Sequence, residues 1–217
     1  MDFALAKYNM IQSQLRTWDI LDQKVLDTFS LLNREDFVPA KFKDLAYADV
    51  EIPIGGGQIM LTPKLGGRMV QELEIQKDDL VLQIGTGTGF ITALISFLAK
   101  KVISSEIDPE LHKIARISLE KYSRHNIMLL QEDGLSDRNE TTLFDKIILT
   151  GSLPVIPEIL KSKLSTGGRM IGVFGQNPIM SVVLLVKGPQ SELIESKVFE
   201  TCIPSLLQKN FVPGFDF

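Results

Sequence analysis

The chain has 217 residues, of which 44% are hydrophobic and 23% are charged, so it is a globular domain rather than a disordered or collagen-like protein. Its net charge of −4 argues against a broad nucleic-acid-binding surface, and its single cysteine excludes an internal disulfide. Two histidines leave little for a zinc site, and the longest apolar run, 90–99, is about half of the ~20 residues needed to cross a membrane. Since residues 1–10 also lack the pattern of a signal peptide, we expect a cytoplasmic protein that binds no metal, nucleic acid or membrane.

Residues 2–50 are predicted to be mainly helical. Apolar residues recur at steps of four, four and three from Leu21 to Leu32, which places them on one face of a helix. Asp19 is the expected N-cap of this helix, and Pro39 is expected to end the helical run.

Residues 51–61 are predicted to form a loop, because three consecutive glycines, Gly55 to Gly57, are unfavourable inside a regular element. Thr62 and Pro63 then have the pattern of an N-cap followed by a proline in the first helical turn. We expect this next helix to run to about Leu73.

Residues 79–188 alternate between short apolar strands and helices, which predicts an α/β protein with a doubly wound, mostly parallel sheet. The expected strands are 79–84, 101–107, 126–131, 143–150, 169–175 and 181–187. The expected helices are 90–99, 108–125 and 153–164, the last of which ends at Gly167-Gly168. The tail from Leu193 to Phe217 is expected to add one more strand over 193–201 and then irregular chain.

A glycine-rich segment, Gly85-Thr86-Gly87-Thr88-Gly89, stands between a predicted strand and the helix that follows it. Alternating glycines let a ligand approach the backbone, and the first amide groups of the helix face the same crevice. No lysine stands where a P-loop needs one, and the third glycine follows after one residue rather than the two of a dinucleotide fingerprint. This tighter spacing resembles the first motif of class I methyltransferases, which bind S-adenosylmethionine.

Two carboxylates follow the next two strands and are candidate ligands of the same cofactor. Glu106 stands 21 positions after Gly85, where a carboxylate accepts hydrogen bonds from ribose hydroxyls, although a solvated strand-end glutamate is the alternative. Asp133, followed by Gly134, could accept from an adenine amine, although aspartate before glycine is also common in turns. The cofactor-binding residues that we predict are Gly85, Thr86, Gly87, Gly89, Glu106, Ile107, Asp133 and Gly134.

The ordered series of motifs resembles the protein-L-isoaspartate O-methyltransferase family over most of the chain. The resemblance rests on the helical start, on "AYADVEIPIGGGQ", "VLQIGTGTGFITALIS", "SSEIDPEL" and "EDGL", and on "FDKIILTGSLPVIPEIL" and "LSTGGRMIGVFG". It implies a seven-stranded Rossmann-like sheet and an enzyme that methylates the free carboxylate of isoaspartyl residues in damaged proteins or peptides. It also implies an N-terminal helical extension with the substrate loop in residues 1–78, and an S-adenosylmethionine-binding domain in residues 79–217.

The substrate loop departs from the family at the position of its catalytic serine. The loop comprises Gly57, Gln58, Ile59, Met60, Leu61 and Thr62, and Leu61 occupies the serine position. Leucine offers no hydrogen bond to a carboxylate, so the catalytic group stays unassigned. The neighbouring Thr62 is a weak catalytic candidate, and helix capping before Pro63 is its favoured role. Lys64 or Arg68 could attract an anionic substrate, but solvated helix positions are favoured for both.

Three other functions stay open at this point. The first is a methyltransferase of the same fold with a different acceptor, which the loss of the serine suggests. The second is a non-catalytic module that binds S-adenosylmethionine or S-adenosylhomocysteine. The third and most distant is a nicotinamide-dependent oxidoreductase, which the glycine spacing disfavours.

Overall fold

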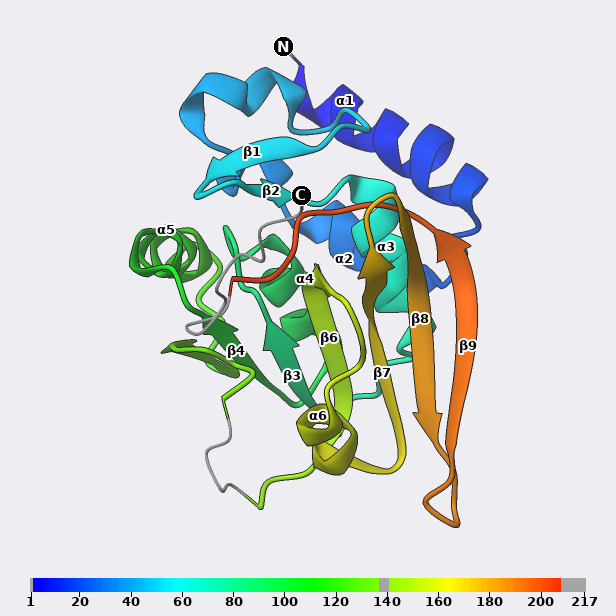
Figure 1. Cartoon of the computed structure of the whole chain (residues 1–217). Coiled ribbons are helices and arrows are strands. Elements are labelled where there is room, and N and C mark those ends of the chain that lie inside the picture. The colour runs from blue at the N-terminus through cyan, green and yellow to red at the C-terminus, as the bar shows by residue number, and fades with distance from the viewer. Residues whose placement is uncertain (1, 137–140, 208–217) are drawn as a thin grey trace.

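The computed structural model describes residues 2–136 and 141–207, and Figure 1 shows the whole chain. A seven-stranded sheet with the order β5-β4-β3-β6-β7-β8-β9 forms its centre. The strands are β3 (Leu80–Ile84), β4 (Lys101–Glu106), β5 (Ile127–Gln131), β6 (Phe144–Leu153), β7 (Leu164–Gln176), β8 (Ile179–Lys187) and β9 (Leu193–Glu200). Pairing is parallel from β5 to β7 and antiparallel at β7–β8 and β8–β9, which confirms the predicted mostly parallel sheet. The irregular chain predicted after residue 201 is confirmed for residues 202–207, whereas the rest of it, residues 208–217, lies outside the described residues.

Helices cover both faces of the sheet because its central strands carry apolar residues on both sides. Val81 faces a large hydrophobic cluster shared with helices α1 to α4, whereas Leu82 faces a second cluster that includes Leu160 of α6. The helices are α1 (Phe3–Met10), α2 (Gln23–Leu31), α3 (Pro63–Glu72), α4 (Phe90–Leu98), α5 (Pro109–Glu120) and α6 (Glu158–Lys163). In Figure 1, α6 lies in front of the sheet while α3 and α4 lie behind it. None of the helices in the described ranges is long and apolar enough to span a membrane.

The N-terminal region, residues 2–50, contributes side chains to the hydrophobic cluster behind the sheet. In Figure 1 it lies above the carboxyl ends of β3 and β4. The π-helical turn Ile11–Leu15 and the 3-10 turn Arg16–Trp18 lie between α1 and α2, and the 3-10 turns Arg34–Asp36 and Ala40–Leu45 follow α2. The predicted helical character of residues 2–50 is therefore confirmed in outline.

Two predicted boundaries in this region are wrong. Helix α2 begins after Asp22, whose side chain accepts the Lys24 amide at 2.8 Å, whereas Asp19 has a positive φ of 61° and ends the preceding turn. The α-helix also ends at Leu31, before Pro39 is reached, and Pro39 instead precedes the 3-10 turn Ala40–Leu45. A proline is accepted there because the first turn of a helix leaves its N–H groups unpaired.

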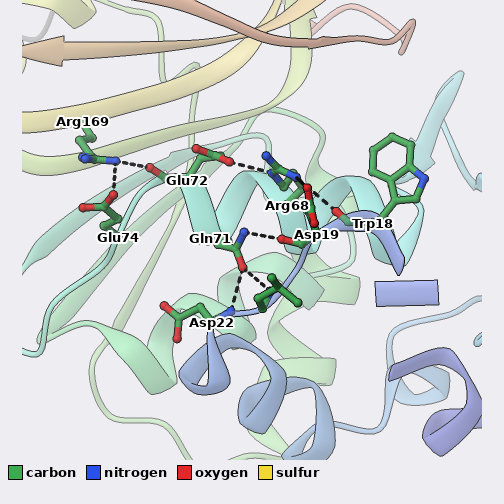
Figure 2. A network of polar contacts seen from close by, with 9 residues as sticks. Trp18, Asp19, Asp22, Arg68, Gln71, Glu72, Glu74 and Arg169 are labelled. Carbon is green, nitrogen blue, oxygen red and sulfur yellow. Dashed lines mark hydrogen bonds and ion pairs between the residues drawn. The ribbon is translucent and has the colours of Figure 1, made fainter. Parts of the chain in front are cut away.

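A side-chain network joins this N-terminal region to α3 (Figure 2). The Gln71 side chain accepts the amides of Leu21 and Asp22 at 2.7 and 2.9 Å and donates to the Asp19 carbonyl at 2.8 Å. A single glutamine of α3 thereby provides hydrogen-bond partners for the backbone groups of the segment that leads into α2.

The same helix is tied to the sheet by charged groups (Figure 2). Arg68 pairs with Glu72 at 2.7 Å, and Arg169 of β7 donates to the Glu72 carbonyl at 2.8 Å and pairs with Glu74 at 2.9 Å. The N-terminal region and the sheet are therefore fixed to each other through α3.

Residues 51–61 form a β-hairpin, so the prediction of a loop is wrong. Strands β1 (Ile52–Gly55) and β2 (Gln58–Met60) pair antiparallel, with Ile52 opposite Met60. The glycines make the turn, since Gly55, Gly56 and Gly57 all have positive φ values, of 107°, 58° and 73°. The side chains of Ile52, Ile54 and Met60 are buried, and this burial stabilises the hairpin against the rest of the protein.

The helix predicted for residues 153–164 is also too long. Helix α6 covers Glu158–Lys163 only, because Pro154 and Pro157 disfavour helix in the residues before them. Strand β7 starts directly at Leu164, and Gly167-Gly168 fall where its pairing with β6 is interrupted.

Candidate active site

The glycine segment forms a tight turn at the carboxyl end of β3. Gly85, Gly87 and Gly89 have φ values of 87°, 57° and 92°, a region that residues with a Cβ rarely adopt. The amides of Gly85 and Thr86 both donate to the Ser105 carbonyl, at 3.0 and 3.1 Å, which ties the turn to β4. A Cβ on Gly85 would lie 2.8 Å from Leu206 and from Thr150, so this position also requires glycine on steric grounds.

A buried polar network supports the turn from within the protein. The Thr86 hydroxyl bonds the Ser104 hydroxyl at 2.7 Å, and the Thr92 hydroxyl of α4 donates to the Gln83 side chain at 2.7 Å. Gln83, which is fully buried, also donates to the Gly85 carbonyl at 3.2 Å. Sequence reasoning missed these supporting residues, because serine, threonine and glutamine in a strand or helix carry no local signal of such a role.

Glu106 ends β4 directly beside the glycine turn. One carboxylate oxygen accepts the Gly87 amide at 2.7 Å and the other accepts the Asp108 amide at 3.0 Å. The side chain is 5% exposed, and this burial raises the pKa of the Glu106 carboxyl, while the two amides oppose the rise. Asp108 in turn caps α5 by accepting the amides of Glu110 and Leu111.

A cleft at the carboxyl ends of β3, β4 and β5 brings most of the predicted cofactor residues together. Gly85, Gly87, Glu106, Ile107, Asp133 and Gly134 line it. Asp133 turns the chain after β5 by accepting the Leu135 amide at 3.0 Å, and a Cβ on Gly134 would collide with Ser105. Thr86 lies in an adjoining cavity, whereas Gly89 lines neither space and packs against Leu119 of α5 at the start of α4.

The substrate loop divides between the two spaces. Gln58 and Ile59 line the cleft, and Ile59, Met60 and Leu61 line the adjoining cavity, where Leu61 is 5% exposed. Gly57 lines neither space. Thr62 also lies outside both, and its hydroxyl accepts the Leu65 amide at 3.3 Å, which confirms its role as the N-cap of α3.

The two basic residues considered for substrate attraction also lie outside both spaces. Lys64 pairs with Asp49 at 2.6 Å and lies over the Trp18 ring, and Arg68 pairs with Glu72.

Ile54 and the segment after β9, which the sequence did not connect with the site, also reach the cleft. Ile54 of the hairpin lies near the turn, where a Cβ on Gly87 would be 3.3 Å from it. The segment after β9 crosses the end of β6: Ser152 donates to the Pro204 carbonyl and accepts the Leu206 amide. Gln58 donates to the Ser205 carbonyl at 3.1 Å, so the hairpin and this segment meet above the cleft, which Leu206 and Leu207 also line.

Three comparisons place this chain among known proteins. The family described as protein-L-isoaspartate(D-aspartate) O-methyltransferase matches residues 6–206. The protein-L-isoaspartate O-methyltransferase of Koribacter versatilis is 36% identical over 98% of this chain and 96% of its own length, and that of Myxococcus xanthus is 38% identical over 89% of each. A Plasmodium falciparum crystal structure of the same description, in complex with S-adenosyl-L-homocysteine, superimposes with a TM-score of 0.82 at 18% identity, over 97% of this chain and 100% of that one.

Proposed function

Since this chain belongs to the protein-L-isoaspartate(D-aspartate) O-methyltransferase family, we propose that it methylates the free carboxylate of L-isoaspartyl residues in damaged proteins and peptides. The methyl donor in this family is S-adenosylmethionine. The family match includes both the glycine turn and the substrate loop, so the proposal concerns the site described above.

The cleft suits S-adenosylmethionine in the chemistry of its walls. Gly85 and Gly87 of the turn line the cleft, and without side chains they let a ligand approach the backbone there. We assign Glu106 to the ribose hydroxyls, because a buried carboxylate that already accepts two amides keeps lone pairs for two further donors. Asp133 and Gly134 line the same cleft and are assigned to the adenine end.

Bound S-adenosylmethionine supplies a methyl group activated by a sulfonium, so the protein needs to supply alignment rather than a strong base. An acceptor carboxylate has a pKa of about 4 and is already ionised at neutral pH. Orientation of the reactants is worth roughly 7–11 kcal/mol of barrier lowering. Ile54, Ile59 and Leu206 line the cleft beside the turn and give this part of its wall an apolar character.

The convergence of three strand ends on one cleft, with Glu106 beside Gly87, is the observation that carries this proposal. The test is transfer of tritiated methyl groups to an L-isoaspartyl peptide, with the aspartyl peptide of the same sequence as control. We expect methylation of the first peptide only. Absence of methylation of the isoaspartyl peptide, with S-adenosylhomocysteine binding intact, would refute the assigned acceptor.

One observation, the apolar character of the substrate loop, favours a second candidate function, in which the enzyme methylates a group other than a carboxylate. Ile59, Met60 and Leu61 stand in the cavity beside the turn, and none offers a hydrogen bond to a carboxylate. The methylated product distinguishes the two possibilities, because a carboxyl methyl ester hydrolyses in mild base whereas a methylated nitrogen or sulfur does not. A base-stable product would favour the second candidate function.

A further inference from the structure

Arg34 is a buried cation beside the proposed catalytic site. It opens the short 3-10 turn Arg34–Asp36, is 1% exposed, and lines the cavity that Leu61 and the glycine turn share. Among the described residues that line the cleft or this cavity, Arg34 is the only lysine, arginine or histidine.

The guanidinium of Arg34 is held in place by neutral groups. Its Nε donates to the Ala46 carbonyl and its Nη2 to the Leu61 carbonyl, both at 2.7 Å. Its centre lies 4.8 Å from the centroid of the Phe90 ring. Within residues 2–136 and 141–207, the side-chain hydrogen bonds of Arg34 run from Nε and Nη2 and not from Nη1, and no carboxylate forms an ion pair with the guanidinium.

This arrangement leaves most of a buried charge uncompensated. Burial lowers the pKa of Arg34 to about 9, against weaker support from Tyr47 and Asp49. Asp49 is itself paired with Lys64 at 2.6 Å. Arg34 still carries its charge at neutral pH, and an isolated buried cation is costly unless a partner reaches it.

We propose that Arg34 recognises a carboxylate bound in this cavity, with the free Nη1 as a donor. An arginine with free N–H groups is the natural complement of a carboxylate, and no other cation lines the site. This inference rests on the proposed function, because that reaction brings two carboxylates to the site.

One carboxylate belongs to the acceptor, and the other belongs to the amino-acid part of the cofactor. Either carboxylate is a candidate partner of Arg34, because the loop residue Leu61 and the turn residues Gly87 and Thr88 line the same cavity as Arg34. The loop residues from Ile59 to Leu61 offer a carboxylate no side-chain hydrogen-bond donor, because we expect a serine of the family to be replaced by Leu61. This favours the acceptor carboxylate as the partner of Arg34.

A purely structural role for Arg34 makes a different prediction. If the guanidinium only clamps the carbonyls of Ala46 and Leu61, its loss weakens all ligands alike, whatever their charge. Discrimination between matched ligands with and without a carboxylate therefore separates recognition from clamping.

The experiment uses calorimetry to measure two affinity ratios, each for a ligand with the carboxylate relative to its analogue without it, in the wild type, R34Q and R34K. The first compares S-adenosylhomocysteine with its decarboxylated analogue, which keeps the adenosine, the thioether chain and the amine but lacks the carboxylate. The second compares an L-isoaspartyl peptide with its isoasparaginyl twin, which carries an amide instead. R124Q is the matched control, because Arg124 also donates to a carbonyl, that of Ser96, and stacks on a phenylalanine, Phe97, but lines neither the cleft nor the cavity.

We expect R34Q to reduce at least one ratio by roughly 10- to 100-fold, R34K to retain part of it, and R124Q to leave both unchanged. The ratio that falls identifies the carboxylate. If both ratios are unchanged in R34Q, the proposal is wrong and Arg34 is a clamp. If R34Q does not fold, the NMR signals of the Arg34 guanidinium in the wild type provide the test. We expect them to shift when a ligand with the carboxylate binds and to stay unchanged with the analogue that lacks it. Equal shifts with both ligands would show that the proposal is wrong. If the protein binds and methylates no isoaspartyl peptide, the proposed function fails by itself, and the cofactor ratio still tests Arg34.

Discussion

The Glu106→Gln substitution gives the sharpest test of the cofactor assignment. In the structure the Glu106 carboxylate accepts the amides of Gly87 and Asp108, at 2.7 and 3.0 Å. Glutamine keeps the shape of the side chain but replaces one acceptor oxygen with an NH₂ group. That NH₂ group cannot accept the hydrogen bond from the backbone amide or ribose hydroxyl that the oxygen accepted. The substitution therefore removes the negative charge and one acceptor without creating a cavity.

The expected loss follows from the hydrogen bonds that depend on the charge. Bonds to a charged group are worth about 1.5–3 kcal/mol, which corresponds to a roughly 10- to 150-fold weaker binding of S-adenosylhomocysteine. Because Glu106 is 5% exposed, solvent screening does not reduce this figure much. Glu110→Gln is the matched control, since Glu110 is exposed and does not line the cleft.

The pH dependence of binding provides a second readout of the same residue. Burial raises the pKa of Glu106 above the ordinary value of 4.5, and only the ionised form accepts from both ribose hydroxyls. Affinity for S-adenosylhomocysteine should thus weaken as the pH falls through this raised pKa, and E106Q should lose that dependence. Calorimetric titration at several pH values measures both effects. An affinity in E106Q equal to that of the wild type would refute the assignment of Glu106 to the ribose.

Three further substitutions test the fold and the loop. Gln71→Ala leaves the amides of Leu21 and Asp22 without their acceptor and should lower the free energy of unfolding by about 1–3 kcal/mol in urea titration; an unchanged midpoint would contradict the role given to this glutamine. Gly89→Ala forces a Cβ into a φ of 92° and to 3.1 Å from Leu119, so we expect a loss of about 1–3 kcal/mol and a lower melting temperature, and an unaltered melting curve would count against the strain argument. Leu61→Ser should raise kcat/KM for an isoaspartyl peptide by roughly tenfold through the added hydroxyl while lowering stability, whereas equal or lower turnover would show that the natural acceptor does not need a donor there.

The parts of the site that the sequence predicted are those built by local chain geometry. A strand followed at once by alternating glycines and a helix fixes where Gly85 and Gly87 lie, because parallel strands end at the same edge of a sheet. Glu106 and Asp133 follow from the same rule, since Glu106 ends the next strand, β4, and Asp133 follows the one after it, β5. No long-range information was needed for any of these four.

The parts that the sequence did not predict depend on contacts between distant segments. Gln58 and Ser205 are 147 positions apart, and nothing in either segment indicates that they meet above the cleft. Arg34 lies 27 positions before Leu61 in a helical stretch, where an arginine ordinarily faces water. The prediction of a loop at residues 51–61 failed for a different reason: three glycines with positive φ are compatible with a hairpin turn, and Gly55 itself ends strand β1 opposite Gln58.

Leu61, which we expect to occupy the family's serine position, gives the loop an apolar side chain, while the backbone at this position is held from both sides. The Leu61 carbonyl accepts from Arg34 at 2.7 Å, and the next residue, Thr62, caps α3. Neither contact involves the side chain of residue 61, so a serine and a leucine there are expected to share one backbone path. A chain of this family can therefore lose the hydroxyl without disturbing the turn at Gly85 or the carboxylate of Glu106. Acceptor recognition and cofactor binding are thus separable in this fold, and any divergence in substrate is expected to arise in the cavity between Leu61 and Arg34 rather than in the cleft.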